Sequence, residues 1–259
     1  MQLKILQLNT WAGTHFDKIE DFITKNDFDI LCLQEIAGPN SHVGNLHSSE
    51  DQFLKFQQLL QNTHYGEMAI ATRFSSDPIN SYDANAIFYK KDFSLTHKDV
   101  LTLTKGIDPF PSSMTTYEEN GRNTLRLTLT KDEKIVDVIS AHLAWAPTHS
   151  EQPHQRAQNK HLIAYIQELK NPFLLAGDFN IDPEQPTILD LEKYTQDLTK
   201  EYNVANTIDP VYHHAWEKLA PGFPVDYIFV SPSIRVIDFT VLDTIHLSDH
   251  FGLTAVVEI

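Results

Sequence analysis

Short apolar runs alternate with segments of helical periodicity along the chain, and this alternation predicts an α/β protein. Runs rich in Val, Ile, Leu, Phe and Tyr are typical of buried strands. We predict strands at Leu3–Leu8, Ile30–Gln34, Ala84–Tyr89, Thr124–Thr130, Ile135–Ser140, Phe173–Ala176, Val225–Val230 and Leu253–Glu258. Apolar residues recur on one face of the predicted helices, which are Asp17–Lys25, Asp51–Gln61, Gln155–Leu169 and Thr187–Tyr194.

The predicted strands between residues 84 and 140 follow one another without a helix, so a simple alternating βαβ wheel does not fit. Mixed sheets packed together, with helices on the outside, fit better. Segments 37–48, 105–121 and 203–224 are predicted loops. We see no internal repeat and no domain boundary, so we predict one domain over residues 1–259, although this length also permits two smaller domains.

The composition is that of an ordinary folded protein, with 41% hydrophobic and 21% charged residues. No apolar segment reaches the roughly 18–20 residues that span a bilayer, and no signal peptide or amphipathic basic helix is visible. We therefore expect a cytoplasmic monomer without stable membrane association. The single cysteine, Cys32, lies in an apolar run, which predicts a core residue and excludes a disulfide within the chain.

The formal charge of −15 reflects 35 acidic against 20 basic residues. Such a charge disfavours long-range attraction to a polyanion, so we do not expect nonspecific binding to long duplexes. A nucleic-acid groove would need a local cluster of basic residues, for which Arg122, Arg126 and Arg156 are candidates. Small phosphodiesters, DNA ends, short RNA and phospholipid headgroups stay open as substrates.

Polar residues stand at the ends of the predicted strands with unusual regularity. They are Asn9, Glu35, His142, Asp178, Asn180, Asp226, Asp249 and His250. A sheet holds side chains at strand ends rigidly while leaving them open to a ligand. Each residue alone has an ordinary explanation, such as a turn cap for an Asp or a surface imidazole for a His. A chance pattern would need an ordinary explanation for every one of these residues at the same time. The pattern therefore favours a functional site.

Asp178 and Asn180 are two residues apart and directly follow an apolar run. In an extended chain their side chains project to the same side, which predicts that both reach the same water and phosphate. Asp178 is the candidate for orienting or deprotonating a water. We expect His250 to pair with Asp226, because a carboxylate fixes the tautomer of an imidazole and stabilises its protonated form.

Hard oxygen ligands such as Glu35, Asp249 and the Asn9 amide oxygen suit Mg²⁺, with Mn²⁺ as a substitute. A structural zinc site would instead need Cys and His clusters that the chain lacks. An ion of this kind polarises a phosphoryl oxygen and offsets charge on the leaving group. The set of residues therefore predicts phosphoester hydrolysis.

Six motifs in chain order resemble those of the endonuclease/exonuclease/phosphatase superfamily. They are Asn9, Leu33-Gln34-Glu35, Ser140-Ala141-His142-Leu143, Gly177-Asp178-Phe179-Asn180, Val225-Asp226-Tyr227-Ile228 and Ser248-Asp249-His250-Phe251-Gly252-Leu253. Each motif alone is weak, but all six in this order are specific and cover essentially the whole chain. The resemblance implies a four-layer sandwich of two packed mixed β-sheets flanked by helices. It also implies Mg²⁺-dependent hydrolysis by in-line attack of water.

The resemblance also implies roles for individual residues. Glu35 would be the main metal ligand, with Asn9 beside it and Asp249 completing the metal environment. Asp178 would position the water with help from Asn180. The scissile phosphate would be contacted by His142 and His250, with Asp226 orienting His250. Arg122 resembles a phosphate-binding position in some branches, with a solvated strand-edge charge as the alternative.

The branch of the superfamily stays open. The motifs around Arg122, His142 and the C-terminal run resemble 5′-tyrosyl-DNA phosphodiesterases, whereas residues 9–13 are closer to sphingomyelinase-like members. Abasic-site endonucleases resemble the chain less, because they place a tyrosine where His142 stands. Four aromatic residues are candidates for stacking on a base or tyrosyl ring, with loop anchoring as the alternative. They are Trp145, which we predict to bind substrate, Trp216, Phe110 and Tyr117.

We therefore predict a metal-dependent phosphodiesterase of the nuclease type that acts on nucleic-acid ends or short nucleic acids. The first alternative is a phosphodiesterase or phosphatase for a small molecule or a phospholipid headgroup. The second is a noncatalytic binding module on the same fold. A noncatalytic module does not need the complete set of polar residues, so the presence of the whole set argues against this second alternative.

Overall fold

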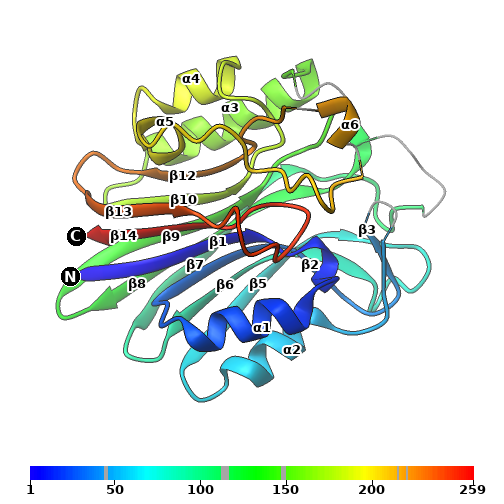
Figure 1. The fold of residues 1–259 in the computed structure, drawn as a ribbon, viewed down its shortest axis with the longest axis horizontal. Coiled ribbons are helices and arrows are strands. Elements are labelled where there is room, and N and C mark those ends of the chain that lie inside the picture. The colour runs from blue at the N-terminus through cyan, green and yellow to red at the C-terminus, as the bar shows by residue number, and fades with distance from the viewer. Residues whose placement is uncertain (44–45, 112–116, 147–149, 215, 220) are drawn as a thin grey trace.

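The computed structural model describes residues 1–43, 46–111, 117–146, 150–214, 216–219 and 221–259, and two six-stranded sheets dominate it (Figure 1). The first sheet has the order β13-β14-β1-β2-β6-β5, with strands Arg235–Val241, Leu253–Glu258, Gln2–Asn9, Ile30–Ala37, Tyr82–Lys90 and His64–Arg73. The second has the order β11-β12-β10-β9-β8-β7, with strands Gln196–Asp197, Asp226–Val230, Phe173–Asp178, Lys134–His142, Arg122–Lys131 and Ser94–Thr104.

Both sheets are mixed. Strand β1 runs parallel to β2, and β10 runs parallel to β9, whereas the other pairs of neighbours are antiparallel. In this register Asp178 pairs with His142 on one side and with Asp226 on the other. Strand pairing alone therefore places three predicted site residues side by side at one end of the second sheet.

Helices cover the outer faces of both sheets (Figure 1). Helices α1 (Phe16–Lys25) and α2 (Gln52–Leu60) pack on the first sheet, where Ile19 and Phe56 share an apolar cluster with Leu6. Helices α3 (Pro153–Gln167) and α4 (Pro186–Leu191) pack on the second sheet through Leu162 and Ile188. The four layers confirm the predicted sandwich. The shorter elements are η1 (Trp11–Gly13), β3 (Ser41–Val43), β4 (Leu46–Ser48), η2 (Tyr117–Glu119), α5 (Leu198–Glu201) and α6 (Trp216–Leu219).

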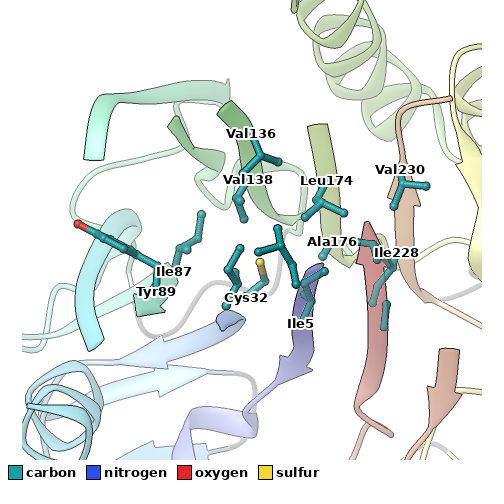
Figure 2. Packing of buried hydrophobic residues seen from close by; sticks show 14 of the residues in the cluster. Ile5, Cys32, Ile87, Tyr89, Val136, Val138, Leu174, Ala176, Ile228 and Val230 are labelled. Carbon is teal, nitrogen blue, oxygen red and sulfur yellow. The ribbon is translucent and has the colours of Figure 1, made fainter. Parts of the chain in front are cut away.

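The facing sides of the two sheets change character along the strands. Near the chain termini they form an apolar core in which Ile5, Cys32, Val138 and Leu174 are buried (Figure 2). Because side chains alternate along a strand, the next inward positions of the same strands are also on this face. Apart from Ala176, those positions are polar, and they are Gln7, Asn9, Gln34, Ser140, His142 and Asp178. The apolar core therefore gives way to polar residues at one end.

All eight predicted strands and all four predicted helices are present, with boundaries that differ by a few residues. The prediction missed β5, β7, β11 and β13 because they lie at sheet edges and show no clear apolar run. Most side chains of β7 and β13 are exposed or half-buried. The predicted loop 37–48 contains the hairpin of β3 and β4, whose short strands lack any pattern. None of the described helices is long and apolar enough to cross a membrane.

Candidate active site

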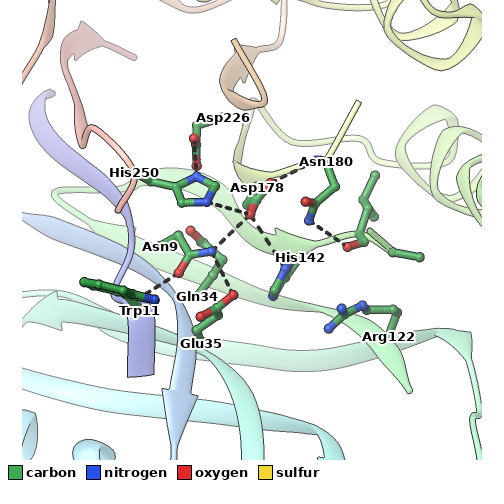
Figure 3. Close-up of polar contacts among 12 residues, drawn as sticks. Asn9, Trp11, Gln34, Glu35, Arg122, His142, Asp178, Asn180, Asp226 and His250 are labelled. Atoms are coloured by element: carbon green, nitrogen blue, oxygen red, sulfur yellow. Dashed lines mark hydrogen bonds and ion pairs between the residues drawn. The ribbon is translucent and has the colours of Figure 1, made fainter. Parts of the chain in front are cut away.

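The predicted polar residues of the two sheets meet at the strand ends beyond the apolar core (Figure 3). Asn9 joins the sheets at the centre of this site. Its side-chain nitrogen donates to Asp178 Oδ2 at 3.0 Å and to Glu35 Oε1 at 3.2 Å, while its oxygen accepts the Trp11 backbone N–H at 3.0 Å. Asn9 thus holds two carboxylates close together, and its role as a metal ligand stays a prediction.

Glu35 reaches the site through an irregularity of β2. Regular alternation would place it on the helix-covered face with Leu33, but the register against β6 shifts between Leu33 and Ile36. The backbone of Glu35 adopts a left-handed φ of 54° at this point. Bulges of this kind re-aim side chains beside active sites. The result is the contact between Glu35 and Asn9 described above.

The environment of Glu35 disfavours its ionised form unless a cation is bound nearby. Burial raises the pKa of this carboxyl to about 8, and the charges of Asp249 and Asp83 add to the effect. A bound cation would favour the ionised form instead. Asp249 is itself buried, and burial also raises its pKa. The half-buried Glu35 and the buried Asp249, whose charges influence each other, therefore lie where the sequence predicted metal ligands.

Asp178 lies between several polar groups at the end of β10. Its Oδ1 accepts the Asn180 backbone N–H at 2.9 Å, and its Oδ2 lies 3.7 Å from His142 Nε2 and 3.9 Å from His250 Nε2. A Cβ atom on the preceding Gly177 would overlap the carbonyl oxygen of Ala141, so glycine lets β10 approach β9 closely here. Burial raises the pKa of Asp178 to about 7, which suits a proton acceptor at neutral pH.

His250 and Asp226 form the expected pair. The Nδ1 atom of His250 lies 2.8 Å from Asp226 Oδ2, and the other carboxylate oxygen accepts a hydrogen bond from Gln7 Nε2 at 2.9 Å. Burial is the largest single influence on His250 and lowers its pKa. The charges of Asp226, Asp178 and Asp249 together outweigh burial and raise the pKa well above its ordinary value. His250 is therefore a protonated donor whose Nε2 faces Asp178.

His142 has the opposite charge state. Its side chain is buried, and burial lowers its pKa well below the ordinary value, with further lowering by the charges of Arg122 and His250. The site consequently combines a neutral imidazole with a protonated one on two sides of Asp178. Environments that separate the pKa values of two like groups are typical of acid–base sites.

Asn180 departs from the extended geometry that the sequence suggested. Strand β10 ends at Asp178, and Asn180 has a left-handed φ of 55°. The reason is the turn closed by the bond from the Asn180 N–H to Asp178 Oδ1, a local bond that Asp often makes. The premise of an extended chain is therefore wrong. The side chain still lies beside Asp178 and donates to the Leu143 carbonyl at 3.2 Å (Figure 3).

Arg122 is buried beside Asp83, so the alternative of a solvated edge charge is wrong. Only 7% of Arg122 is exposed, yet its single described ion pair, from Nη1 to Asp83 Oδ2, is long at 3.5 Å. Among the described residues its Nε has no hydrogen-bond partner. Burial raises the pKa of Asp83 to about 6, with Arg122 opposing this rise. A buried guanidinium with unused donors is suited to an anion.

The four predicted stacking residues lie in different settings. Phe110 is buried, and its backbone bonds to Arg73 and Ser75, so it anchors its loop. Trp145 is half-buried three residues after His142, and its role in substrate binding stays a prediction. Trp216 opens α6, and the side chain of Tyr117 lies outside the described residues.

Several site residues were missed in the sequence. The ring of His213 lies 5.8 Å from that of His250, and ligand atoms of His213, Asp249 and His250 lie within 4.8 Å of one another. Trp11 and Tyr212 flank the same region. Trp11 follows the predicted strand Leu3–Leu8, but an aromatic residue there gave no sign of a site. His213 and Tyr212 belong to the predicted loop 203–224, which carries no periodic pattern.

The donor set fits a hard divalent cation. Glu35 and Asp249 would hold it through carboxylate oxygens, and the described part of the site contains more buried acids than cationic groups. Asp178, Asp226 and His250 also lie within 4.8 Å of one another. We assign Asp226 an orienting role instead, because both its oxygens already accept hydrogen bonds or pair with His250.

The sequence pattern of the Endonuclease/Exonuclease/phosphatase family matches residues 6–250. No functionally curated protein matches the chain. Among solved structures, an endonuclease/exonuclease/phosphatase from Bacteroides vulgatus is 18% identical with a TM-score of 0.73, covering 100% of this chain and 99% of that one. The human Nocturnin catalytic domain with bound sulfate is 19% identical (TM-score 0.70; 99% and 93% covered). Truncated Caenorhabditis elegans TDP2 is 16% identical with a TM-score of 0.66, covering 100% of this chain and 98% of that one.

These likenesses show the same fold, and the family pattern covers every strand end that carries a site residue. The chain therefore belongs to the Endonuclease/Exonuclease/phosphatase family, and it is a phosphoesterase of that family.

Proposed function

We propose that the protein is a Mg²⁺- or Mn²⁺-dependent phosphodiesterase that acts on nucleic-acid ends or short nucleic acids. The observation that supports this most directly is the setting of Asp178. Its carboxylate, with a pKa of about 7, lies between the neutral His142 and the protonated His250 and is bonded to Asn9. This arrangement suits a group that takes a proton from water beside donors for a phosphate.

The charge of the site favours a diester over a monoester. Four buried acids, Asp83, Asp178, Asp226 and Asp249, and the half-buried Glu35 surround the site, whereas Arg122 and His250 are its buried cationic groups in the described structure. A divalent cation would offset only part of this excess. A phosphodiester carries one negative charge and a monoester about two at neutral pH, so the diester meets less repulsion.

The residues of the chain divide the reaction among them. Asp178 orients the attacking water and receives its proton. His250, held by Asp226, donates from Nε2 toward a phosphoryl oxygen, and Arg122 uses its free donors on another. When bound by Glu35 and Asp249, the metal ion would polarise the phosphoryl group and offset charge on the leaving oxygen. Hydrolysis by in-line attack of water would result.

The size of the substrate follows from the overall charge. A chain of formal charge −15 repels a long polyanion, so the substrate presents few phosphates beyond the scissile one. The sulfate bound to the human Nocturnin catalytic domain supports a site for a tetrahedral anion in this fold. Ends and short pieces of nucleic acid are consistent with both observations.

The test compares bis-p-nitrophenyl phosphate, p-nitrophenyl phosphate and labelled single-stranded oligonucleotides, each with Mg²⁺, Mn²⁺ or EDTA. We expect cleavage of the diesters with either ion and none with EDTA. Asp178→Asn should lower kcat about 10²–10⁴-fold, because general-base catalysis typically contributes this much. Asp238→Asn, on the exposed edge of β13, is the matched control and should keep full activity.

Two results would overturn the proposal. Diester cleavage that survives both EDTA and Asp178→Asn would exclude the mechanism. A higher kcat/KM for the monoester than for every diester would exclude the phosphodiesterase assignment while leaving a phosphatase of the same family.

A further inference from the structure

Trp11 lies on the side of the active site away from Arg122 (Figure 3), and it belongs to an aromatic cluster. The rings of Trp11 and Tyr212 stack at 6.1 Å with an interplanar angle of 28°, and the His15 ring lies 4.4 Å from that of Tyr212. The His15 ring also meets Trp11 edge-on at 5.5 Å. We call Trp11, His15 and Tyr212 the aromatic platform. Two segments far apart in the chain, the turn after β1 and the loop 203–224, build it.

The platform is tied directly to the catalytic residues. The backbone N–H of Trp11 donates to the oxygen of Asn9, whose nitrogen holds Asp178 and Glu35. On the other segment, His213 follows Tyr212 and places its ring 5.8 Å from that of His250. The two segments that carry the platform therefore also contact Asn9 and His250 of the site.

The backbone of the platform is held in an unusual conformation. Trp11, Ala12 and Gly13 have successive left-handed φ values of 51°, 51° and 70°. This conformation costs free energy for a residue with a Cβ, and such strain concentrates at active sites and ligand clamps. The rings of Trp11, His15 and Tyr212 are half-buried, so each keeps an exposed part. The surrounding structure thus holds partly exposed aromatic rings beside the site at a conformational cost.

The polar groups around the platform restrict the class of ligand that it can bind. Lys18 Nζ donates to the Tyr212 hydroxyl at 2.8 Å and lies 4.9 Å from the centre of the Tyr212 ring, which puts a cationic donor at the outer edge. Burial lowers the pKa of His15, with the charge of Lys18 lowering it further, so its ring is neutral and can stack. A nucleobase combines a flat π-face for such a surface with a carbonyl edge that Lys18 can reach as a donor. A tyrosyl ring has a flat face but no carbonyl for Lys18.

We propose that the aromatic platform is a nucleobase subsite, which stacks the base attached to the scissile phosphate and presents Lys18 to its carbonyl edge. This inference rests on the proposed phosphodiesterase function and names the substrate class as nucleotidyl. Stacking on aromatic side chains tolerates every base, because every base has a π-face. The subsite therefore selects nucleotides over other phosphodiesters without selecting a sequence.

The test uses two esters with the same leaving group. One is thymidine 5′-(p-nitrophenyl phosphate), and the other is its base-free counterpart with 1,2-dideoxyribose. We expect kcat/KM to be at least about tenfold higher for the base-bearing ester. Tyr212→Leu should reduce this ratio toward one, whereas Tyr212→Phe, which keeps the ring, should retain most of it. Tyr65→Leu, at an exposed tyrosine of β5, is the control and should leave the ratio unchanged.

A ratio near one in the wild type, or a ratio that Tyr212→Leu leaves intact, would overturn the subsite while phosphodiester cleavage stands. If neither ester is cleaved, the proposed function fails. The subsite is then tested separately, by measuring ligand binding. Calorimetry would then compare thymidine 5′-monophosphate with deoxyribose 5-phosphate. Binding of the nucleotide at least about tenfold tighter, lost in Tyr212→Leu, would support the subsite, and equal binding would overturn it.

Discussion

The two ends of the space between the sheets use the same strands and the same faces, yet they differ in every chemical respect. At one end Leu3 and Ile5 of β1 pack against residues of the second sheet in a fully buried apolar core. At the other end Gln7 and Asn9, the next inward positions of β1, bridge the sheets by hydrogen bonds.

The polar end is buried as deeply as the apolar end. Gln34 donates to Ser140 at 3.0 Å across the sheets, and Asn85 donates to Asn123 at 3.0 Å. Buried side chains of this kind contribute little net stability, because folding exchanges bonds to water for bonds within the protein. They do fix the separation and orientation of the strand ends. The comparison teaches that the apolar end supplies most of the stability and that the polar end positions the proposed catalytic groups.

The largest expected effect is on the stability of the apolar end. Leu127→Ala removes a fully buried side chain between the sheets and should lower the free energy of unfolding by about 2–5 kcal/mol. For a chain of this size each kcal/mol corresponds to a Tm change of about 2–4 °C. The kcat of the folded fraction should stay near that of the wild type. Thermal denaturation and kinetics at low temperature would measure both, with Leu54→Ala on the exposed face of α2 as control.

The second effect is on the activity of the polar end. Arg122→Gln should lower kcat/KM for a phosphodiester about 10²-fold by removing a phosphate donor. It should also lower Tm, because Asp83 loses its only described cation. The double variant Asp83→Asn/Arg122→Gln should recover Tm without recovering activity. If the double variant were fully active, Arg122 would have a structural role alone.

The third effect links metal, pH and stability through Glu35. Its carboxyl titrates near 4.5 in the unfolded chain and at about 8 in the metal-free fold. Between these values the folded state keeps a proton that the unfolded state has lost, so the stability contribution of Glu35 is present at low pH and declines as pH rises toward 8. We expect the Tm of the wild type, relative to Glu35→Gln, to fall over this range in EDTA.

Mn²⁺ should reverse that decline in the wild type, because metal binding favours the ionised carboxylate and stabilises the folded state that binds it. Thermal unfolding between pH 5 and 8.5, with and without the ion, would measure the effect. An equal gain of Tm with Mn²⁺ in Glu35→Gln would mean that the ion binds elsewhere.

The smallest expected effect comes from the layer between the two ends. Gln7→Leu removes the hydrogen bonds to Asp226 Oδ1 and Gln34 Oε1. Only the bond to Asp226 bears on His250, so kcat should fall only several-fold, as expected for a bond of about 1 kcal/mol. Without this donor the Asp226 charge acts more strongly on His250, so its pKa should rise. The alkaline limb of the pH–rate profile should then move to higher pH. Gln57→Leu on the exposed face of α2 is the control, and an unmoved limb would separate Gln7 from catalysis.

The elements that could be predicted are those with a strong local pattern. Apolar runs such as Ile30–Gln34 marked the central strands, and polar residues at their ends marked most of the site. Edge strands such as β7 escaped because their exposed side chains carry no such pattern. The bulge that turns Glu35 and the turn at Asn180 depend on backbone geometry that residue types alone do not specify.

Contacts between distant segments escaped for another reason. Trp11 and Tyr212 meet across about two hundred residues, and each looks like an ordinary loop residue by itself. By contrast, the pairing of His250 with Asp226 was expected, because a carboxylate partner fixes the tautomer of an imidazole and stabilises its protonated form. Chemistry therefore predicted the pairing of His250 with Asp226, whereas the surroundings of the candidate site depend on how the loops fold.

The left-handed backbone at Trp11, Ala12, Glu35, Asn180 and His246 has a practical consequence for protein engineering. Valine, isoleucine and threonine are excluded at such φ values by their branched Cβ, whatever the chemistry of the new side chain. Mutant libraries aimed at new specificity should restrict these positions to glycine, asparagine, aspartate and the native residue. A wider range of substitutions is better placed at Tyr212 and Lys18, where the main chain does not have a left-handed φ.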